Sequence, residues 1–327
     1  MHSAPATTRA RALCAAVLAL AALAPVSAAP RRAGAPPPAG RGAEGATWEP
    51  IRRVFGQRGE AEDGYFKITL PRTDLHVRIA GDALDPGFEF TSYLGFVPMG
   101  DGRVMAMGEV VLAVDEVPAA LAAAHRQDVT VSALHNHLLG ESPRIVYMHV
   151  MAEGAPGELA QRLRAVYAAT GTPLGPPSEE RPTGDWSAVD AVLGPHAEAS
   201  GRIAEYEFAR RGPLRVGGMA VRSSGLLETA SEAVFQRLPG APGHVASTGE
   251  LFVAPTEVDP VVRALDANGL HVTAVHNHMV DDSPQLFWIH WYATGDAVRL
   301  ARGAAAALAR MNGDRRSHGE GGDGRGR

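Results

Sequence analysis

The pattern of hydrophobic and polar positions along the chain occurs twice. Residues 48–56 show the apolar spacing of an amphipathic helix that ends in glycine, and residues 186–194 repeat it 138 positions later. An alternating apolar and polar stretch follows each helix, at 65–70 and 203–208, and predicts a half-buried strand. The chain is therefore predicted to contain two copies of one structural unit.

A second shared pattern runs without a gap through residues 108–149 and 249–290. Of these 42 aligned positions, 14 are identical, which is too many for chance at one fixed spacing. Each copy predicts a strand, a helix, a strand that ends in two histidines, a return strand and a final helix. The three strands and the final helix are expected at 109–113, 129–137, 145–152 and 156–168, and at 250–254, 270–278, 286–293 and 296–311.

The order strand, helix, strand indicates a right-handed crossover, and we expect the first strand to pair directly and in parallel with the histidine strand. The predicted fold class is α+β, a tandem duplication of a mixed β-sheet unit with covering helices and a pseudo-twofold axis. Repeat 1 is assigned to 47–170 and repeat 2 to 185–311, joined by a Pro- and Gly-rich linker over 171–184. A polar tail over 312–327 is expected to be disordered. The pattern leaves open whether the repeats share one continuous sheet.

The first residues have the features of an export signal. Two arginines precede an apolar run at 13–23, and residues 26–28 form a small-residue cleavage site. We predict a signal peptide over 1–28, a disordered tether over 29–46 and an exported protein that is periplasmic or secreted. The only cysteine, Cys14, begins the apolar run. A lipid anchor is therefore not expected, and the mature chain contains no disulfide.

Composition narrows the classes of function. The chain is 45% hydrophobic and 20% charged, with a formal net charge of −5, which is typical of a globular protein. This acidic balance argues against binding nucleic acid or anionic membranes. No run in the mature chain has the length of a transmembrane segment. The sequence also lacks a P-loop and a G-x-S-x-G motif, which argues against the common nucleotide-binding and serine-hydrolase classes.

The histidines are the strongest candidates for chemistry. Alternate side chains on a strand share one face, so His135 and His137 point the same way with Cα atoms about 6.7 Å apart. His149 on the return strand is expected to join them. Such nitrogen ligands predict a divalent transition metal, zinc or manganese, in one site or two. The corresponding residues of the second copy are His276, His278 and His290.

Carboxylates are expected at the same sites. Glu141 and Asp282 each follow the second histidine by four residues and are candidate metal ligands. Glu109 and Glu250 begin the strand expected beside the histidine strand, and are candidate catalytic bases or further ligands. A metal with an open coordination position then supports hydrolysis.

Two other interpretations remain open at this stage. The histidines can form a structural polar network, bonded to Ser, Asn and backbone groups. They can also line a metal-free site, either catalytic or belonging to a non-catalytic module that binds a cell-envelope small molecule, glycan or peptide. An open coordination position favours an enzyme, whereas a closed shell or a dry aromatic groove favours binding.

The two histidine phrases carry a family resemblance. Residues 130–143 contain Leu-His-Asn-His and Glu-Ser-Pro, and residues 272–284 contain Val-His-Asn-His and Asp-Ser-Pro. The chain resembles the LppY/LpqO family of exported, duplicated bacterial proteins, which is classed as a domain of unknown function. The resemblance covers about residues 48–311 and implies export and the duplicated architecture. Some members are lipoproteins, and this chain lacks the cysteine of a lipid-attachment site.

Overall fold

The computed structural model describes residues 44–317, with the exception of residues 179 and 241. The predicted signal peptide, the tether up to residue 43 and the tail from residue 318 lie outside the described residues. The first helix begins at Glu44, three residues before the predicted start of repeat 1, in a sequence of Glu, Gly and Ala in which Glu and Ala favour helix.

Repeat 1 forms a six-stranded sheet with three helices. The strand order is β1-β2-β5-β6-β9-β7. Apolar residues at alternate positions of β2, such as Phe66 and Ile68, reach the core beneath the helices. The elements are α1 (Glu44–Phe55), β1 (Glu60–Glu62), β2 (Tyr65–Pro71), β5 (Thr91–Pro98), β6 (Val104–Ala113), α2 (Val117–Arg126), β7 (Thr130–His135), β9 (Ile145–Gly154) and α3 (Pro156–Tyr167).

Repeat 2 reproduces this arrangement in a separate sheet of order β10-β11-β14-β15-β17-β16. The tandem duplication and the α+β class are therefore confirmed. The described residues of the predicted linker lie outside helices and strands. The elements are α4 (Ser187–Leu193), β10 (Glu198–Ser200), β11 (Ile203–Ala209), β14 (Ala230–Arg237), β15 (His244–Val253), α5 (Val258–Ala267), β16 (His271–His276), β17 (Phe287–Asp296) and α6 (Ala297–Leu308).

Short elements complete each repeat. In repeat 1, β3 (Arg78–Ile79) pairs with β4 (Asp82–Ala83) and β8 (Glu141–Ser142). In repeat 2, β12 (Leu214–Val216) pairs with β13 (Met219–Val221). The 3-10 helices η1 (Pro86–Phe88) and η3 (Gly225–Leu227) precede β5 and β14, and η2 (Val114–Glu116) precedes α2.

The expected direct parallel pairing between the first strand and the histidine strand is wrong. Strands β6 and β7 do run in the same direction, but β9 lies between them and pairs antiparallel with both. The same insertion occurs in repeat 2, where β17 lies between β15 and β16. The return strand follows the histidine strand through a short loop, and an antiparallel neighbour forms readily through such a loop.

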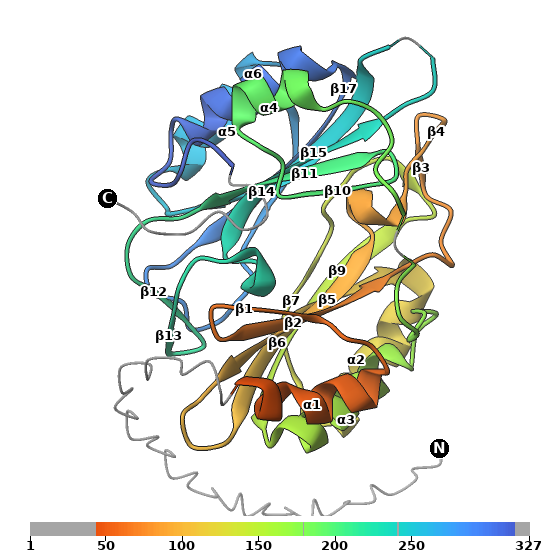
Figure 1. Ribbon diagram of the computed structural model, residues 1–327, viewed down its shortest axis with the longest axis vertical. Coiled ribbons are helices and arrows are strands. Elements are labelled where there is room, and N and C mark those ends of the chain that lie inside the picture. Colours follow the sequence, from red (N-terminus) through yellow and green to blue (C-terminus); the bar gives the residue numbers. More distant parts are fainter. Residues whose placement is uncertain (1–43, 179, 241, 318–327) are drawn as a thin grey trace, which may run out of the picture. The chain divides into compact units, whose positions relative to one another are not determined.

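The two sheets pack against each other through their inner faces. Each outer face carries helices, α1 to α3 on repeat 1 and α4 to α6 on repeat 2 (Figure 1). Two further cores contain residues of both repeats. One joins Met105 and Met107 to Leu227 and Trp288, and the other joins residues of β9 and β14. The inner face of each sheet, which carries the histidines, is thus buried against the other repeat.

The polar tail departs from its prediction at its start. Residues 312–317, which were expected to be disordered, lie along β11. The backbone amide of Asp314 donates to the carbonyl of Ala209, and the Ser317 hydroxyl accepts from the amide of Glu207. Strand β11 leaves these polar groups of its backbone available, and a short polar segment satisfies them.

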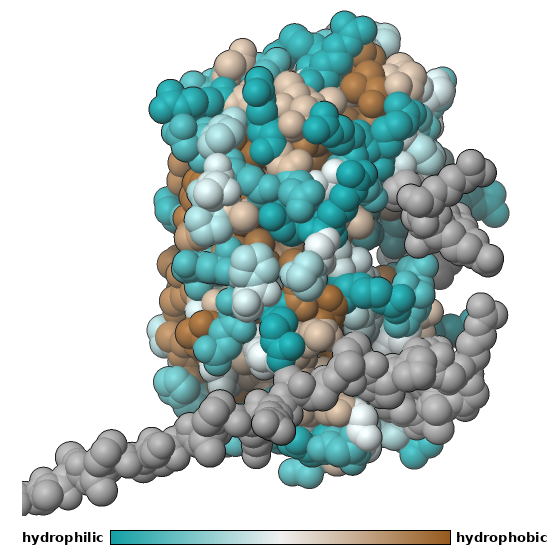
Figure 2. Space-filling model, turned by 90° about the vertical axis from the view of Figure 1, so that its left-hand side faces the viewer, coloured by the Kyte–Doolittle hydropathy of each residue, from teal (hydrophilic) through white to brown (hydrophobic). Residues whose placement is uncertain are grey.

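The outer surface combines polar and apolar residues. On the face shown in Figure 2, hydrophilic residues are interspersed with hydrophobic ones, which gather along one edge of the view. The most exposed large apolar side chains include Leu134 and Leu139, and their repeat-2 counterparts Val275 and Val280. None of the described helices combines the length and the hydropathy that crossing a membrane requires.

A glycine precedes the inner-face glutamate of each repeat because two strands approach closely there. A methyl group at Gly108 would collide with the Tyr93 carbonyl oxygen, and one at Gly249 with the Trp291 ring. We expect Gly108→Ala and Gly249→Ala each to lower the free energy of unfolding by about 1–3 kcal/mol, measured by urea denaturation. Gly175→Ala is the control, since a methyl group there meets no atom within 4 Å. Wild-type stability in both variants would contradict this packing argument.

Candidate metal centre

The strand register brings the histidines of each repeat to its inner face. Strand β7 ends at His135, and His137 follows two residues later. On the neighbouring β9, His149 lies opposite Glu109 of β6 and opposite Ala133 of β7. In repeat 2, His290 takes the corresponding place opposite Glu250. The predicted association of three histidines with Glu109 and with Glu250 therefore follows from antiparallel pairing.

The histidines of the two repeats meet in one centre. The His135 and His276 rings stack with centroids 3.6 Å apart. His137 stacks on His290 at 3.8 Å, and His149 on His278 at 3.7 Å. Exchanging the repeats maps the last two pairs onto each other, so the first pair lies at the pseudo-twofold axis. The three closest ring contacts between histidines all join the two repeats, so the six histidines form one cluster and not two.

Three glutamates surround the rings. Glu109 Oε2 lies 3.3 Å from His137 Nε2 and 3.2 Å from His149 Nε2. Glu250 lies 3.4 Å from His278 Nε2 and 3.9 Å from His290 Nε2 in the corresponding positions. The third, Glu89, has no equivalent in this centre. Its Oε2 lies 3.0 Å from His137 Nδ1, and its Oε1 accepts a 2.7 Å hydrogen bond from the Thr248 hydroxyl of repeat 2.

Most of the ring nitrogens are buried without a hydrogen-bond partner. Among the described residues, nine of the twelve nitrogens of these six rings make no well-aligned hydrogen bond, and five of the nine lie 3.2–3.9 Å from a glutamate oxygen. Burying an unpaired polar atom costs free energy, so the other four nitrogens, on His135, His149 and His276, require a partner that the described side chains do not supply. Of the Ser, Asn and backbone partners expected in a structural polar network, the described residues supply one, the Asn136 carbonyl at 3.3 Å from His135 Nδ1.

Burial and neighbouring charges raise some pKa values in the centre and lower others. Burial opposes ionisation of Glu89, but hydrogen bonds and charge from His137 and His290 lower its pKa to about 2. Burial also disfavours charge on His137, but Glu109 and Glu89 raise its pKa to about 10. Burial and the nearby histidines lower the pKa of His135 to about 2. The pKa values of His276 and His278 are lowered for the same reasons, and that of His290 falls to about 4.

Four groups of side chains place three ligand atoms within 4.8 Å of one another. Three groups draw on both repeats. A zinc ion holds its nitrogen ligands at about 2.0–2.1 Å, which leaves them up to about 4.2 Å apart, so small side-chain movements bring these atoms into ligating range. The groups are His135, His149 and His278; His135, His137 and His276; Glu89, His137 and His290; and Glu109, His137 and His149.

Glu141 and Asp282 do not belong to these groups. Glu141 lies in β8 and is buried, and its Oε1 accepts a 3.4 Å hydrogen bond from the amide of Ile145. Asp282 occupies the equivalent loop of repeat 2, where burial and Asp281 raise its pKa to about 7. The structure thus brings together the six histidines with Glu109 and Glu250. It places Glu141 and Asp282 beside this centre, in the segments that follow the histidine strands.

Sequence reasoning did not identify Glu89, whereas the strand periodicity does place Tyr147 and Trp288 on the face of the histidines. Glu89 follows η1 and lies between two buried phenylalanines, an unusual place for a carboxylate and the one available signal. Tyr147 stacks on His137 with centroids 3.5 Å apart, and Trp288 stacks on His278 at 3.8 Å. Both aromatic residues precede a histidine of the return strand by two positions, as the strand periodicity indicates.

The asparagine between the two histidines has a structural role. The Asn136 side-chain amide donates to the carbonyl oxygens of Leu138 and Thr273, each at 3.2 Å. Asn277 donates to the carbonyl of Met279 at 3.3 Å. These bonds fix the chain where each histidine strand ends, and Asn136 also links the two repeats.

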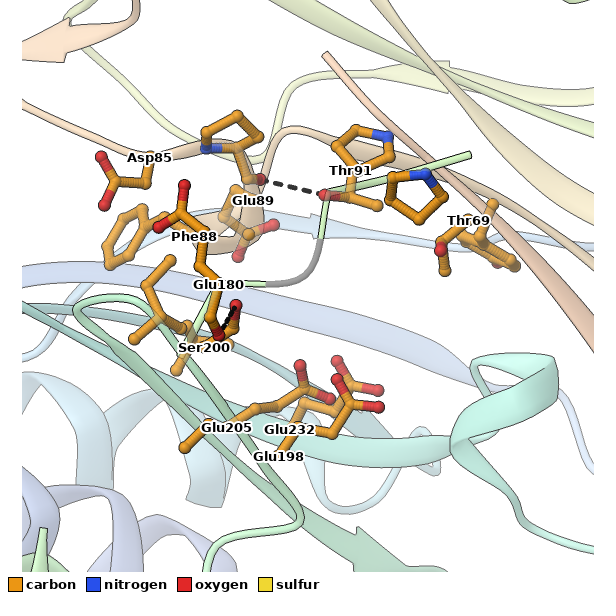
Figure 3. A pocket seen from close by; sticks show the side chains of 18 of the residues that line it. Thr69, Asp85, Phe88, Glu89, Thr91, Glu180, Glu198, Ser200, Glu205 and Glu232 are labelled. Carbon is orange, nitrogen blue, oxygen red and sulfur yellow. Dashed lines mark hydrogen bonds between the residues drawn. The ribbon is translucent and has the colours of Figure 1, made fainter. Parts of the chain in front are cut away.

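A cavity of about 840 Å³ lies beside the centre, between the two sheets. Its wall includes His137, Glu89, Glu109 and Glu250, so the cavity reaches the histidines. Figure 3 shows Glu89, Phe88 and Thr91 on the repeat-1 side, across from Glu205 and Glu232. A volume of this size is typical of small-molecule sites.

The fold and this centre define a duplicated α+β protein with histidines at the junction of its repeats. A family model described as "Domain of Unknown Function (DUF1259)" matches residues 49–169 and again residues 187–310. The chain belongs to this family, which confirms the expected resemblance and its duplication.

Comparisons with curated proteins and with solved structures give no further information about the function of this chain. No curated protein matches this chain. The trimeric bacterial microcompartment shell protein PduB aligns with 77% of this chain and 89% of its own, at 13% identity. Its TM-score of 0.20 does not indicate a shared fold.

Proposed function

We propose that this protein binds a divalent transition metal, zinc or manganese, at the histidine centre between its repeats. The observation that carries the proposal is the set of nine buried ring nitrogens without a well-aligned hydrogen bond, in a centre where groups of three ligand atoms lie within 4.8 Å of one another. Imidazole nitrogens with a carboxylate oxygen are a common donor set for such metals. A metal ion would supply the partner that these nitrogens require.

We further propose that the centre is hydrolytic. A bound metal lowers the pKa of water and polarises a substrate oxygen. Glu109 and Glu250 line both the centre and the cavity, and are the candidate bases for a nucleophile that approaches from the cavity. The neighbouring His137 and His149 lower the pKa of Glu109 despite its burial, so Glu109 is the ionised one of the two in the metal-free protein. Tyr147 and Trp288 cover two of the histidines and keep bulk water from those rings.

The second candidate is a non-catalytic module that binds a small molecule, glycan or peptide of the cell envelope. The volume of the cavity supports it, because holding a metal ion alone requires far less space. Export is part of both proposals. It rests on the basic start, apolar run and cleavage site of residues 1–28.

Metal analysis of the mature protein, purified without chelator or a histidine tag, tests the first proposal. We expect about one equivalent of zinc or manganese per chain, since the six histidines form one centre. Protein that stays metal-free after incubation with either ion and gel filtration would refute metal binding. Metal-loaded protein that hydrolyses no ester, amide or glycoside in a broad substrate panel would favour the binding module.

A further inference from the structure

The wall of the cavity is strongly acidic on the side away from the histidines. The cavity wall as a whole includes ten carboxylate residues, against Lys67, Arg202 and His137 as basic ones. Lys67 pairs with Glu228 at 2.5 Å, Arg202 with Asp85, and His137 with Glu89 and Glu109. The charge of Lys67 also acts on Glu205 and Glu232. The carboxylate residues are Glu60, Asp85, Glu89, Glu109, Glu180, Glu198, Glu205, Glu228, Glu232 and Glu250.

The strand register places several of these carboxylates next to one another. Glu198 lies directly opposite Glu205, and Glu232 directly opposite Glu250. Like charges in such cross-strand pairs destabilise a sheet. Figure 3 shows Glu198, Glu205 and Glu232 side by side along one wall. A bound cation would stabilise the ionised forms of these neighbouring carboxylates.

Apart from the groups that face the histidines, two buried polar atoms in this wall lack a partner among the described residues. One is Oε1 of Glu232. The other is the hydroxyl of Tyr93, a residue only 5% exposed that lines the cavity and lies opposite Glu109 in the sheet. Burial, with the charges of Glu228, Glu109 and Glu250, raises the pKa of Tyr93, so its hydroxyl stays protonated among these carboxylates. A ligand in the cavity would pair both atoms.

The acidic wall is a difference between the two repeats. Lys67 and Glu205 are both the third residue of their strands, β2 and β11. Tyr93 and Glu232 are both the third residue of β5 and β14. The histidines are the same in both repeats, whereas these cavity positions differ in charge. The cavity thus has one strongly acidic side and one mixed side, which suits an unsymmetrical ligand.

We propose that the cavity binds an organic cation with a protonated amine, held by Glu205, Glu232 and the Tyr93 hydroxyl. A bare metal ion would neutralise the charge but would leave most of the 840 Å³ unfilled. An ammonium group donates three hydrogen bonds and matches several carboxylates at once. Binding of the amine does not require the metal, and an amine held here has the rest of its molecule beside the histidine centre.

Calorimetry of the full chain with cadaverine, in the presence of EDTA, tests this assignment. We expect Glu232→Gln to weaken cadaverine binding by about tenfold to a hundredfold, the range for losing a charge-assisted hydrogen bond. Tyr93→Phe should weaken it by a few fold through loss of its hydroxyl. Glu158→Gln is the matched control, because it removes the same charge from an exposed position of α3 outside the cavity.

A neutral probe separates charge from shape. The diol analogue of cadaverine has the same chain length and no charge, and we expect it to bind far more weakly. Equal affinities for diol and diamine, or an unchanged affinity in both Glu232→Gln and Tyr93→Phe, would overturn the proposal. Mg²⁺ is titrated separately, into protein that was treated with EDTA and then dialysed free of it. Binding of Mg²⁺ there, with no binding of cadaverine, would also overturn the proposal and assign the wall to an inorganic cation. The EDTA in the cadaverine titration keeps that result independent of the histidine centre, whose metal content is measured separately.

Discussion

Replacing His135 and His137 together with alanine is expected to remove nearly all of the bound metal. Each of the four groups of converging ligand atoms contains at least one of these two histidines. If each repeat held its own metal, the double variant would keep about half, because the histidines of repeat 2 are untouched. The stacking of every histidine on one from the other repeat predicts the larger loss.

The measurement is metal per chain by mass spectrometry after loading and gel filtration. The control is the double variant His125→Ala and His271→Ala, which removes two exposed histidines from α2 and β16. It should retain the wild-type content. A His135→Ala and His137→Ala protein that is folded, as circular dichroism reports, and holds half the wild-type metal would show two independent sites.

The metal-free protein is expected to lose stability as the pH rises from 6.5 to 8. Burial and neighbouring carboxylates raise the pKa of Glu205 from 4.5 to about 8, and raise those of Glu232 and Glu250. The pKa of His137 is also raised, to about 10. A raised pKa gives stability that is complete below the unfolded value and is lost as the pH rises through the folded value.

The other histidines do not alter this direction. Those with a lowered pKa are neutral in the folded protein but about half protonated in the unfolded chain at pH 6.5, so each opposes the loss by only about 0.4 kcal/mol between pH 6.5 and 8. Each raised group contributes a loss of up to about 1.4 kcal/mol per pH unit. The histidines with a lowered pKa are His135, His276, His278 and His290.

Urea denaturation at pH 6.5 and 8, with EDTA present, measures this effect. The double variant Glu205→Gln and Glu232→Gln should lose clearly less stability over that interval, and at pH 8 should be more stable than the wild type. Glu158→Gln should follow the wild type. A wild-type midpoint that stays constant or rises between the two pH values would show that these glutamates are ionised in the folded protein.

The sequence predicts what is local or repeated. Strands and helices follow from hydrophobic periodicity, and the fixed spacing between two sets of histidines reveals the duplication. The strand order was not predicted correctly, because the position of β9 between β6 and β7 depends on which pairing of distant strands is most stable. The contact between the histidines of the two repeats could not be predicted either. Periodicity shows which face of a strand is buried, but it does not show which other element covers that face.

Glu89 shows why part of the centre was missed. Its counterpart after η3 is Glu228, which forms an ion pair with Lys67 instead of approaching a histidine. The two glutamates therefore share a position in the fold but have different partners, so comparing the repeats gives no reason to select either. By contrast, the histidines and the Gly-Glu pairs keep one role in both repeats, and the comparison finds them.

The stacked His135 and His276 rings place the pseudo-twofold axis inside the candidate metal centre. That geometry is the one found at an isologous interface between two identical subunits. A single repeat on two separate chains would thus form a similar centre, but every change in its sequence would appear on both sides. Joining the repeats in one polypeptide removes this constraint. Lys67 and Glu205 illustrate the result, because a fused chain can evolve a polarised cavity around a symmetric set of ligands.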